Sequence, residues 1–236
     1  MENFTTFLER INAFEKPVMT LPCEPFSVNP SLKNKVNNSN LFNPFFGDTI
    51  VFDLCKSDKE KIGTIVDTLY REVPECFCEK LGSNTFHVTL HDLCNSTSLD
   101  EIAAEICRNE EKLSELFPAK RSVSEKIVFK TNFIINMVGT SLVLALQPKT
   151  EKDYQTLMEL YCTADKVKTL PYPLTPHITL AYYNINGFSA ESAKNLCRTV
   201  NELNKSVFEL EVDTQALYYT KFTDMNNYDY ILPLSL

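Results

Sequence analysis

The apolar and polar positions of the chain follow two periodicities, one typical of helices and one typical of strands. Helical spacing, with residues that favour helix ends, predicts five helices. They are Phe4–Phe14, a helix beginning at Ser57, a helix from Ser98 to about Phe117, Glu151–Asp165 and Ala190–Leu203. Runs rich in β-branched and aromatic residues predict the strands. These are Thr49–Cys55, Lys126–Asn136, Leu142–Leu146, one strand around each of His87 and His177, and strands near Val207–Tyr219 and Tyr228–Pro233.

Local signals refine where the elements begin. Ser57-Asp58-Lys59-Glu60 and Ser98-Leu99-Asp100-Glu101 match the capping box, in which the Ser and Glu side chains bind backbone N–H groups of the first helical turn. Residues 17–44 contain five of the twelve prolines and many asparagines. Such a composition is typical of irregular structure. We therefore expect the regular fold to begin at Asp48.

Two of the three histidines lie in near-copies of one strand pattern, ninety positions apart. The copies read Phe86-His87-Val88-Thr89-Leu90 and Pro176-His177-Ile178-Thr179-Leu180. Alternate residues of a strand share a face, so the His and Thr of each copy point the same way, about 6.6 Å apart along the chain. An imidazole and a hydroxyl at this spacing suit one small anion. The alternative is two buried strands with core histidines, but the match between the copies favours a shared site.

The two halves of the chain repeat the same order of strand, helix, His-Xaa-Thr strand, helix and strand. Asp53 precedes His87 by 34 positions, and Leu144 precedes His177 by 33. We predict an α+β fold in which a duplicated unit forms two lobes, with two antiparallel-rich sheets flanked by helices around a central groove. The predicted organisation is an N-terminal helix and irregular segment over 1–46, then one bilobal domain over 47–236. Its lobes cover about 47–138 and 139–236, with exchange of strands between them left open.

Composition narrows the classes of partner. The net charge of −8 disfavours a long nucleic-acid footprint but allows a ligand with a single phosphate. The sequence shows no apolar run of membrane-spanning length and no signal-type N-terminus, so we expect a cytoplasmic protein. The eight cysteines are scattered without zinc-ligand spacing, as befits a reducing compartment. With only five glycines, the sequence lacks a P-loop or a dinucleotide-binding fingerprint.

The paired motifs resemble those of the 2H phosphoesterase superfamily, which has two His-Xaa-Thr/Ser motifs on facing strands of a bilobal fold. This group includes cyclic nucleotide phosphodiesterases and the LigT-like 2′-5′ RNA ligases. The resemblance covers roughly Phe46 to the C-terminus, and both motifs fit without gaps. Phe46-Gly47-Asp48-Thr49-Ile50-Val51 and Phe222-Thr223-Asp224-Met225 look more faintly like an uncharacterised bacterial branch of the superfamily.

The resemblance implies that His87 and His177 act as a general acid and base, and that Thr89 and Thr179 bind phosphate oxygens. Histidine titrates near neutrality and can take or give a proton, so a bell-shaped pH profile centred near neutrality is expected. No cofactor or metal is then required. Phosphoryl transfer usually recruits cations, yet no Arg or Lys lies beside either motif. Lys221 and Arg121 are candidates that the sequence cannot separate.

The position of His91 raises a metal-binding alternative. On a helix, His87 and His91 would be neighbours able to share zinc, but on a strand they lie about 13 Å apart along the chain. We therefore expect His91 at the edge of the groove or facing solvent.

Aromatic residues near the motifs could stack a nucleobase. The candidates are Phe86, Tyr172 and Tyr182, although alternating aromatics in strands usually belong to the core. The expected function is hydrolysis of a phosphodiester in a nucleotide or an RNA end, a 2′,3′-cyclic phosphate or a 2′-5′ linkage. We expect a monomer that binds such a small substrate and no membrane. A non-catalytic module that binds a phosphonucleotide, and a 2′-5′ RNA ligase, are the alternatives.

Overall fold

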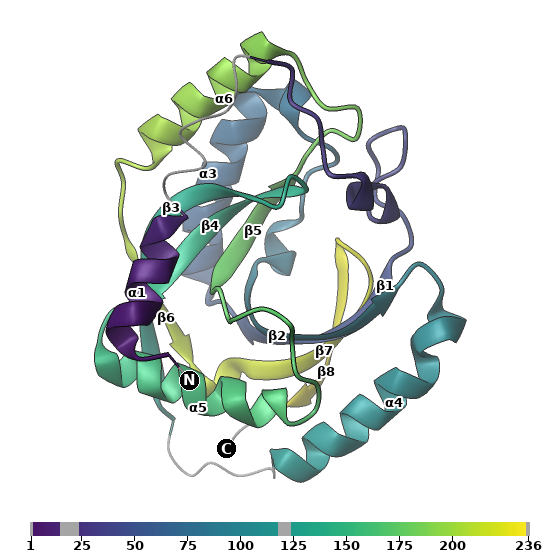
Figure 1. The fold of residues 1–236 in the computed structure, drawn as a ribbon, viewed down its shortest axis with the longest axis vertical. Helices are drawn as coiled ribbons and strands as arrows, with labels where there is room; N and C mark the ends of the chain where they lie inside the picture. Colours follow the sequence, from purple (N-terminus) through teal and green to yellow (C-terminus); the bar gives the residue numbers. More distant parts are fainter. Residues whose placement is uncertain (1, 15–23, 118–123, 235–236) are drawn as a thin grey trace.

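Two four-stranded antiparallel sheets form the centre of the molecule (Figure 1). The computed structural model describes residues 2–14, 24–117 and 124–234. Within them the strands are β1 (Phe46–Asp53), β2 (His87–Ser96), β3 (Lys126–Met137), β4 (Ser141–Pro148), β5 (His177–Tyr182), β6 (Glu209–Asp213), β7 (Leu217–Asp224) and β8 (Asn227–Pro233). The helices are α1 (Phe4–Ala13), α3 (Lys56–Glu72), α4 (Leu99–Leu116), α5 (Glu151–Asp165) and α6 (Ala190–Leu203). This architecture confirms the predicted α+β class.

The two sheets exchange strands between the halves of the chain. One sheet has the order β2-β1-β7-β8, and the other has the order β5-β4-β3-β6. Each motif strand therefore pairs with the first strand of its own half, and that strand pairs in turn with a strand from the other half. Strand β3, which the sequence grouped with the first lobe, belongs to the second sheet. Each sheet therefore contains strands from both halves of the chain.

Of the four inner strands, β1 and β4 are buried over almost their whole length. Strands covered on both faces have continuous apolar runs, as Ile50-Val51-Phe52 and Leu142–Leu146 do here. The motif strands β2 and β5 are instead the edges of their sheets and begin with alternating burial. Their partly exposed positions are the ones that carry the histidines and threonines.

The buried Asp48 carboxylate ties β1 to its neighbours. It accepts hydrogen bonds from the Cys94 backbone N–H at 2.8 Å, from Asn109 Nδ2 at 3.0 Å and from the Tyr219 hydroxyl at 3.0 Å. These donors come from β2, α4 and β7. A buried carboxylate is tolerated when hydrogen bonds satisfy it, so this network is structural.

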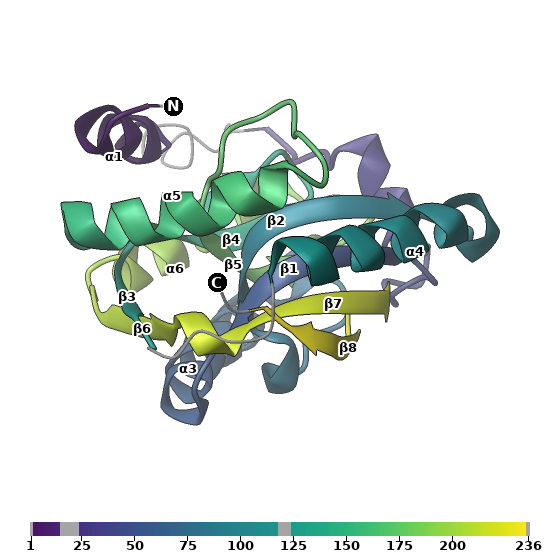
Figure 2. The same ribbon diagram turned by 90° about the horizontal axis from the view of Figure 1, so that it is seen from below.

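The helices cover the outer faces of the sheets (Figure 2). Helix α4 packs on β1 and β2, and α3 packs beside α6. Helix α5 contacts β3 and β4 of one sheet and β2 of the other, so it bridges the lobes. Helix α1 packs on β4 through the buried side chains of Phe7 and Ile11. The described helices include none long and apolar enough to cross a bilayer.

Most predicted helix bounds are confirmed, but both predicted capping boxes are wrong. Helix α3 begins at Lys56 with Cys55 as its N-cap, because Ser57 and Asp58 already lie in the first turn. Helix α4 has the expected N-cap, Ser98, but its side chain makes no capping hydrogen bond. A capping box that the sequence analysis missed opens α5, where Thr150 and Asp153 bind each other's backbone N–H groups. An Asp three residues after the cap can replace the usual Glu.

Residues 24–45, the described part of the segment before β1, form little regular structure and are well anchored. They include a short 3-10 helix, η1 (Pro30–Asn34), and two isolated bridges, Phe26 to Phe188 and Val36 to Phe42. The backbone N–H of Asn29 donates to the Gly139 carbonyl at 2.9 Å. This segment thus packs against the turn between β3 and β4 and against the chain that follows β5.

Candidate active site

The two motif strands meet where the edges of the sheets approach each other. Strands β2 and β5 contact one another although they belong to different sheets, and Figures 1 and 2 show them side by side at the centre. His87 is the first residue of β2, and His177 is the first residue of β5. Protonation of His177 would lower the pKa of His87 further. We call His87, Thr89, His177 and Thr179 the His–Thr cluster.

A matching β-bulge follows the threonine in both motifs. In β2, Thr89 pairs with Val51 and His91 pairs with Ile50, which leaves Leu90 without a partner. In β5, Thr179 pairs with Val143 and Ala181 pairs with Leu142, which leaves Leu180 without one. A bulge shifts the later side chains to the opposite face. The alternation that presents His and Thr together therefore ends at the same point in each strand.

A backbone carbonyl fixes each imidazole in the same way. Nδ1 of His87 lies 2.7 Å from the carbonyl oxygen of Thr85, and Nδ1 of His177 lies 2.7 Å from that of Thr175. Because a carbonyl only accepts, each Nδ1 carries the proton and each neutral ring keeps its lone pair on Nε2. The repeat thus extends upstream to Thr-Xaa-His-Xaa-Thr-Leu, a signal that the sequence analysis missed.

Burial favours the neutral form of both imidazoles. For His87 burial lowers the pKa to about 4, opposed by the Thr85 carbonyl and the Asp92 carboxylate. For His177 burial again lowers the pKa, while the Thr175 carbonyl and Asp92 raise it and Lys35 lowers it. A low pKa leaves Nε2 free to accept a proton near neutral pH.

The motif hydroxyls are open to a ligand. Thr89 and Thr179 are half-buried, whereas the residues on either side of each in sequence are buried. Across the described part of the chain, neither hydroxyl has a hydrogen-bond partner. A half-buried hydroxyl without a protein partner is available to donate to an anion.

Asp92 is an acidic residue of the site that the sequence analysis missed. It follows the bulge in β2, is exposed, and raises the pKa of both motif histidines. The Tyr172 hydroxyl donates to its Oδ2 at 3.1 Å. Simple alternation from His87 would place Asp92 on the opposite face, and only the bulge brings it back. No sequence signal marked that bulge.

The three aromatic candidates have different positions. Phe86 and Tyr182 are buried, and the Tyr182 hydroxyl donates to the Met225 sulfur at 3.0 Å. Tyr172 is 52% exposed and lies beside Asp92. A fourth ring, Tyr228 of β8, packs against His87 with a centroid distance of 5.0 Å. Tyr172 is thus exposed beside Asp92, and the half-buried Tyr228 contacts His87.

The expectation that His91 lies at a groove edge or in solvent is wrong. His91 is 1% exposed, its Nδ1 lies 2.7 Å from the Asp92 carbonyl, and its Nε2 lies 3.4 Å from Asp165 Oδ1. The bulge at Leu90 turns it away from the face of His87, into the contact between β2 and α5. Within residues 2–14, 24–117 and 124–234, no three His, Cys, Asp or Glu side chains gather as a metal site.

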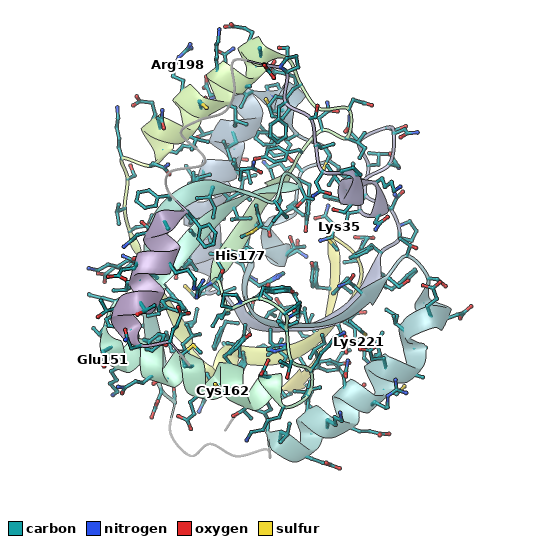
Figure 3. The ribbon with its side chains drawn as sticks, viewed as in Figure 1. Lys35, Glu151, Cys162, His177, Arg198 and Lys221 are labelled. Atoms are coloured by element: carbon teal, nitrogen blue, oxygen red, sulfur yellow. The ribbon has the colours of Figure 1, made fainter. Side chains whose placement is uncertain are left out.

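The structure bears on one of the two candidate cations. Lys221 of β7 lies 2.6 Å from Glu110 of α4, so its charge is already paired (Figure 3). Arg121 lies outside the described residues. Lys59 of α3 lowers the pKa of His87, but its Nζ lies 2.6 Å from Asp53.

The N-terminal region reaches the second motif at two points. Arg10 of α1 donates from Nη2 to the Leu174 carbonyl at 2.8 Å and from Nη1 to the Thr175 hydroxyl at 3.2 Å. It therefore holds the residue whose carbonyl orients His177. Lys35, just after η1, lies near enough to lower the pKa of His177. The sequence analysis gave this region no part in the site.

A cavity of about 570 Å³ lies elsewhere, between the start of α3 and β6. Its lining includes five carboxylates, from Asp53, Asp58, Glu209, Glu211 and Asp213. Its two lysines are paired, Lys61 with Asp58 and Lys126 with Glu211. This acidic lining disfavours a phosphate, and the cavity contains no member of the His–Thr cluster.

Comparison with known proteins yields structural matches only. No family model and no curated protein sequence matches the chain. A conserved protein of unknown function from Agrobacterium tumefaciens, ATU0111, superposes with a TM-score of 0.63 at 15% identity, covering 88% of this chain and 93% of its own. A phosphoesterase structure matches with a TM-score of 0.47 at 17% identity, covering 82% and 99%. E. coli LigT complexed with 3′-AMP matches with a TM-score of 0.45 at 17% identity, covering 81% and 96%. The match to ATU0111 shows that the two proteins share a fold.

Proposed function

We propose that this protein is a metal-independent phosphodiesterase that hydrolyses a phosphodiester in a nucleotide or an RNA end. The substrate is a 2′,3′-cyclic phosphate or a 2′-5′ linkage. One observation carries the proposal. Two imidazoles at the meeting edges of two sheets have their Nδ1 atoms bound to equivalent carbonyls, so both present Nε2 for proton transfer. Such symmetry suits a reaction that takes one proton and gives another.

The reaction balances with these two groups. The neutral imidazole accepts a proton at Nε2 from the attacking water, whose oxygen forms a new bond to phosphorus. The bond from phosphorus to the leaving oxygen breaks, and the protonated imidazole donates its Nε2 proton to that oxygen. The ring that accepted a proton ends charged and the other ends neutral, so exchange with solvent restores the starting state. Water is consumed, and both transfers use imidazoles.

The threonines and the overall charge support the same assignment. Thr89 and Thr179 can donate to the non-bridging phosphate oxygens, where negative charge grows during attack. The net charge of −8 favours a small substrate over a long nucleic acid. Tyr172, exposed beside Asp92, can stack a base.

A substrate screen in EDTA tests the proposal. The purified full chain is offered 2′,3′-cyclic nucleotides and 2′-5′ and 3′-5′ dinucleotides, and products are separated by chromatography. The double variant His87→Ala/His177→Ala, purified in the same way, controls for contaminating hydrolases. Turnover by the wild type alone, unaffected by EDTA, supports the proposal. Binding without turnover, joining of RNA ends, or activity that EDTA removes and zinc restores would overturn it.

A further inference from the structure

The proposed function requires the His–Thr cluster to bind an anion with little positive charge of its own. Burial lowers the pKa of His87 and His177, so both rings favour the neutral form near pH 7. Asp92 adds a negative charge close to both. A phosphodiester is anionic and gains charge as water attacks, and enzymes usually neutralise it with cations. The proposed reaction therefore calls for a positive group that the motifs do not contain.

Most lysines near the motif strands are engaged elsewhere. Lys59 lies 2.6 Å from Asp53 and also donates to the Asn84 carbonyl at 3.3 Å. Lys221 lies 2.6 Å from Glu110. A lysine already paired with a carboxylate contributes little net charge to a neighbouring phosphate.

Lys35 differs because aromatic rings, not carboxylates, surround its ammonium group. Its Nζ lies 5.2 Å from the ring centroid of Phe45 and 5.2 Å from that of Tyr182. Within the described residues Lys35 pairs with no carboxylate, and its side chain is half-buried. Ring faces attract a cation without cancelling its charge. Lys35 thus keeps a full positive charge available for a ligand.

The backbone of Lys35 is held firmly. Its N–H donates to the Leu32 carbonyl at 2.9 Å, and its own carbonyl accepts from the Asn43 N–H at 2.9 Å. Leu32 and Val36 beside it are buried in the core. The position of Lys35 is therefore set by the fold, unlike that of an ordinary surface lysine.

Ring contacts join the surroundings of Lys35 to the first motif. The ring of Phe45 stacks with that of Phe222 at a centroid distance of 6.1 Å. The ring of Phe222 lies 5.4 Å from that of Tyr228, which lies 5.0 Å from the His87 ring. Figure 3 shows Lys35 and His177 directed toward the same central region of the molecule. The charge of Lys35 acts on the His177 ring, whose pKa it lowers.

We propose that Lys35 binds the anionic oxygens of the substrate phosphate held by the His–Thr cluster, which makes the segment before β1 part of the active site. This inference rests on the proposed function for its substrate. Phe45 and Tyr182 hold the ammonium group in place, and the phosphate is the counter-ion it lacks.

Direct binding of inorganic phosphate tests the proposal without any turnover. Calorimetry at low salt compares the wild type with Lys35→Met, Lys35→Arg and the control Lys33→Met, which removes an exposed lysine two positions away. A charge-assisted hydrogen bond is worth enough for Lys35→Met to weaken phosphate binding about 10- to 100-fold. Lys35→Arg should keep most of the affinity, and Lys33→Met should bind as the wild type does. Equal thermal midpoints exclude a folding defect.

The titration of His177 gives a second readout that loss of packing would not reproduce. Removing a nearby positive charge stabilises the imidazolium, so the pKa of His177 should rise in Lys35→Met and stay unchanged in Lys33→Met. NMR of the histidine ring protons measures this shift.

The outcomes separate this inference from the proposed function. Phosphate binding that depends on Lys35, in a protein that hydrolyses no diester, supports Lys35 and refutes the phosphodiesterase. Diester hydrolysis with unchanged kcat/KM and phosphate affinity in Lys35→Met refutes the role of Lys35 alone. No binding of phosphate by the wild type also overturns it.

Discussion

At the scale of single residues, the bond from each Nδ1 to a carbonyl decides which ring nitrogen can react. His87 and His177 both present Nε2, and both rings are biased toward the neutral form. In the proposed reaction, one ring must nevertheless be protonated so that the leaving oxygen receives a proton. The state with one protonated and one neutral ring is therefore the less populated state near neutral pH. Its population rises as the pH is lowered.

This bias predicts an acidic maximum for kcat/KM. Activity falls at low pH as the base becomes protonated and falls at high pH as the acid loses its proton. The fall of kcat/KM at low pH and its fall at high pH both depend on the pKa values of His87 and His177 in the free protein. Both pKa values lie below the usual 6.5, and that of His87 is about 4. The maximum should lie between about pH 4 and 6.5, below the neutral value that the residue types alone predict.

Bound phosphate stabilises the imidazolium, so the profile of kcat should lie at higher pH than that of kcat/KM. Steady-state kinetics over pH 4 to 9 measures both profiles. A kcat/KM maximum above pH 7 would contradict the effect of burial on these rings.

The threonine hydroxyls give a second prediction at this scale. Thr89→Val and Thr179→Val keep the shape of the side chain but remove a donor to the phosphate. If that bond strengthens in the transition state, kcat should fall, by up to about 10³-fold. Thr89→Ser and Thr179→Ser retain the hydroxyl and should keep most of the activity. Equal kcat in the valine and serine variants would show that the hydroxyls do not bind the reacting phosphate.

At the scale of elements, the paired bulges explain why part of the site could not be read from the sequence. Strand alternation predicted the shared face of His87 and Thr89 but also placed His91 on it. The extra residue, Leu90, moves His91 into the core and returns Asp92 to the site. No glycine or other bulge-forming residue marks the position, so nothing in the sequence indicated that strand alternation ends at Leu90.

The contact of α1 with the second motif gives a prediction for an element that the sequence analysis left without a role. Arg10 holds Leu174 and Thr175, and the Thr175 carbonyl orients His177. Arg10→Met should lower kcat by about 10- to 100-fold, because a small displacement of a reacting group is costly, while KM changes little. Kinetics and the NMR titration of His177 measure the effect.

A matched control for this prediction is Glu2→Gln. Glu2 forms an ion pair with Arg10 but does not contact the motif, so its loss should leave kcat within about twofold, as expected for a partly exposed pair of modest strength. Unchanged kcat in Arg10→Met, or an equal loss in both variants, would rule out positioning of His177 by Arg10.

At the scale of the whole molecule, the duplicated order of elements was readable because each half repeats its apolar periodicities. The predicted bounds of α5 and α6 match the structure. Which strands share a sheet could not be predicted from the sequence. Strand β3 joins β4 through a short turn at Gly139, and the chain crosses from β6 in one sheet to β7 in the other within Thr214–Ala216. Pairing partners depend on long-range packing, which local patterns do not encode.

The N-terminal region shows the same limit. Its prolines and asparagines indicated irregular structure, and irregular segments have no periodicity from which the direction of a side chain follows. The sequence therefore did not indicate that Lys35 lies near the second motif. The repeated motifs gave the positions of the histidines, and only the fold gave the charged residues around them.

A double-variant cycle of kcat tests the central claim most directly, because it asks whether His87 and His177 act as one unit. His87→Ala and His177→Ala should each lower kcat by roughly 10²- to 10⁴-fold. The double variant should fall well short of the product of the two losses, since either loss alone already stops the coupled proton transfers. Thermal midpoints close to that of the wild type are expected for all three variants. Activity that persists in both single variants, or losses that multiply in the double variant, would contradict a shared acid–base site.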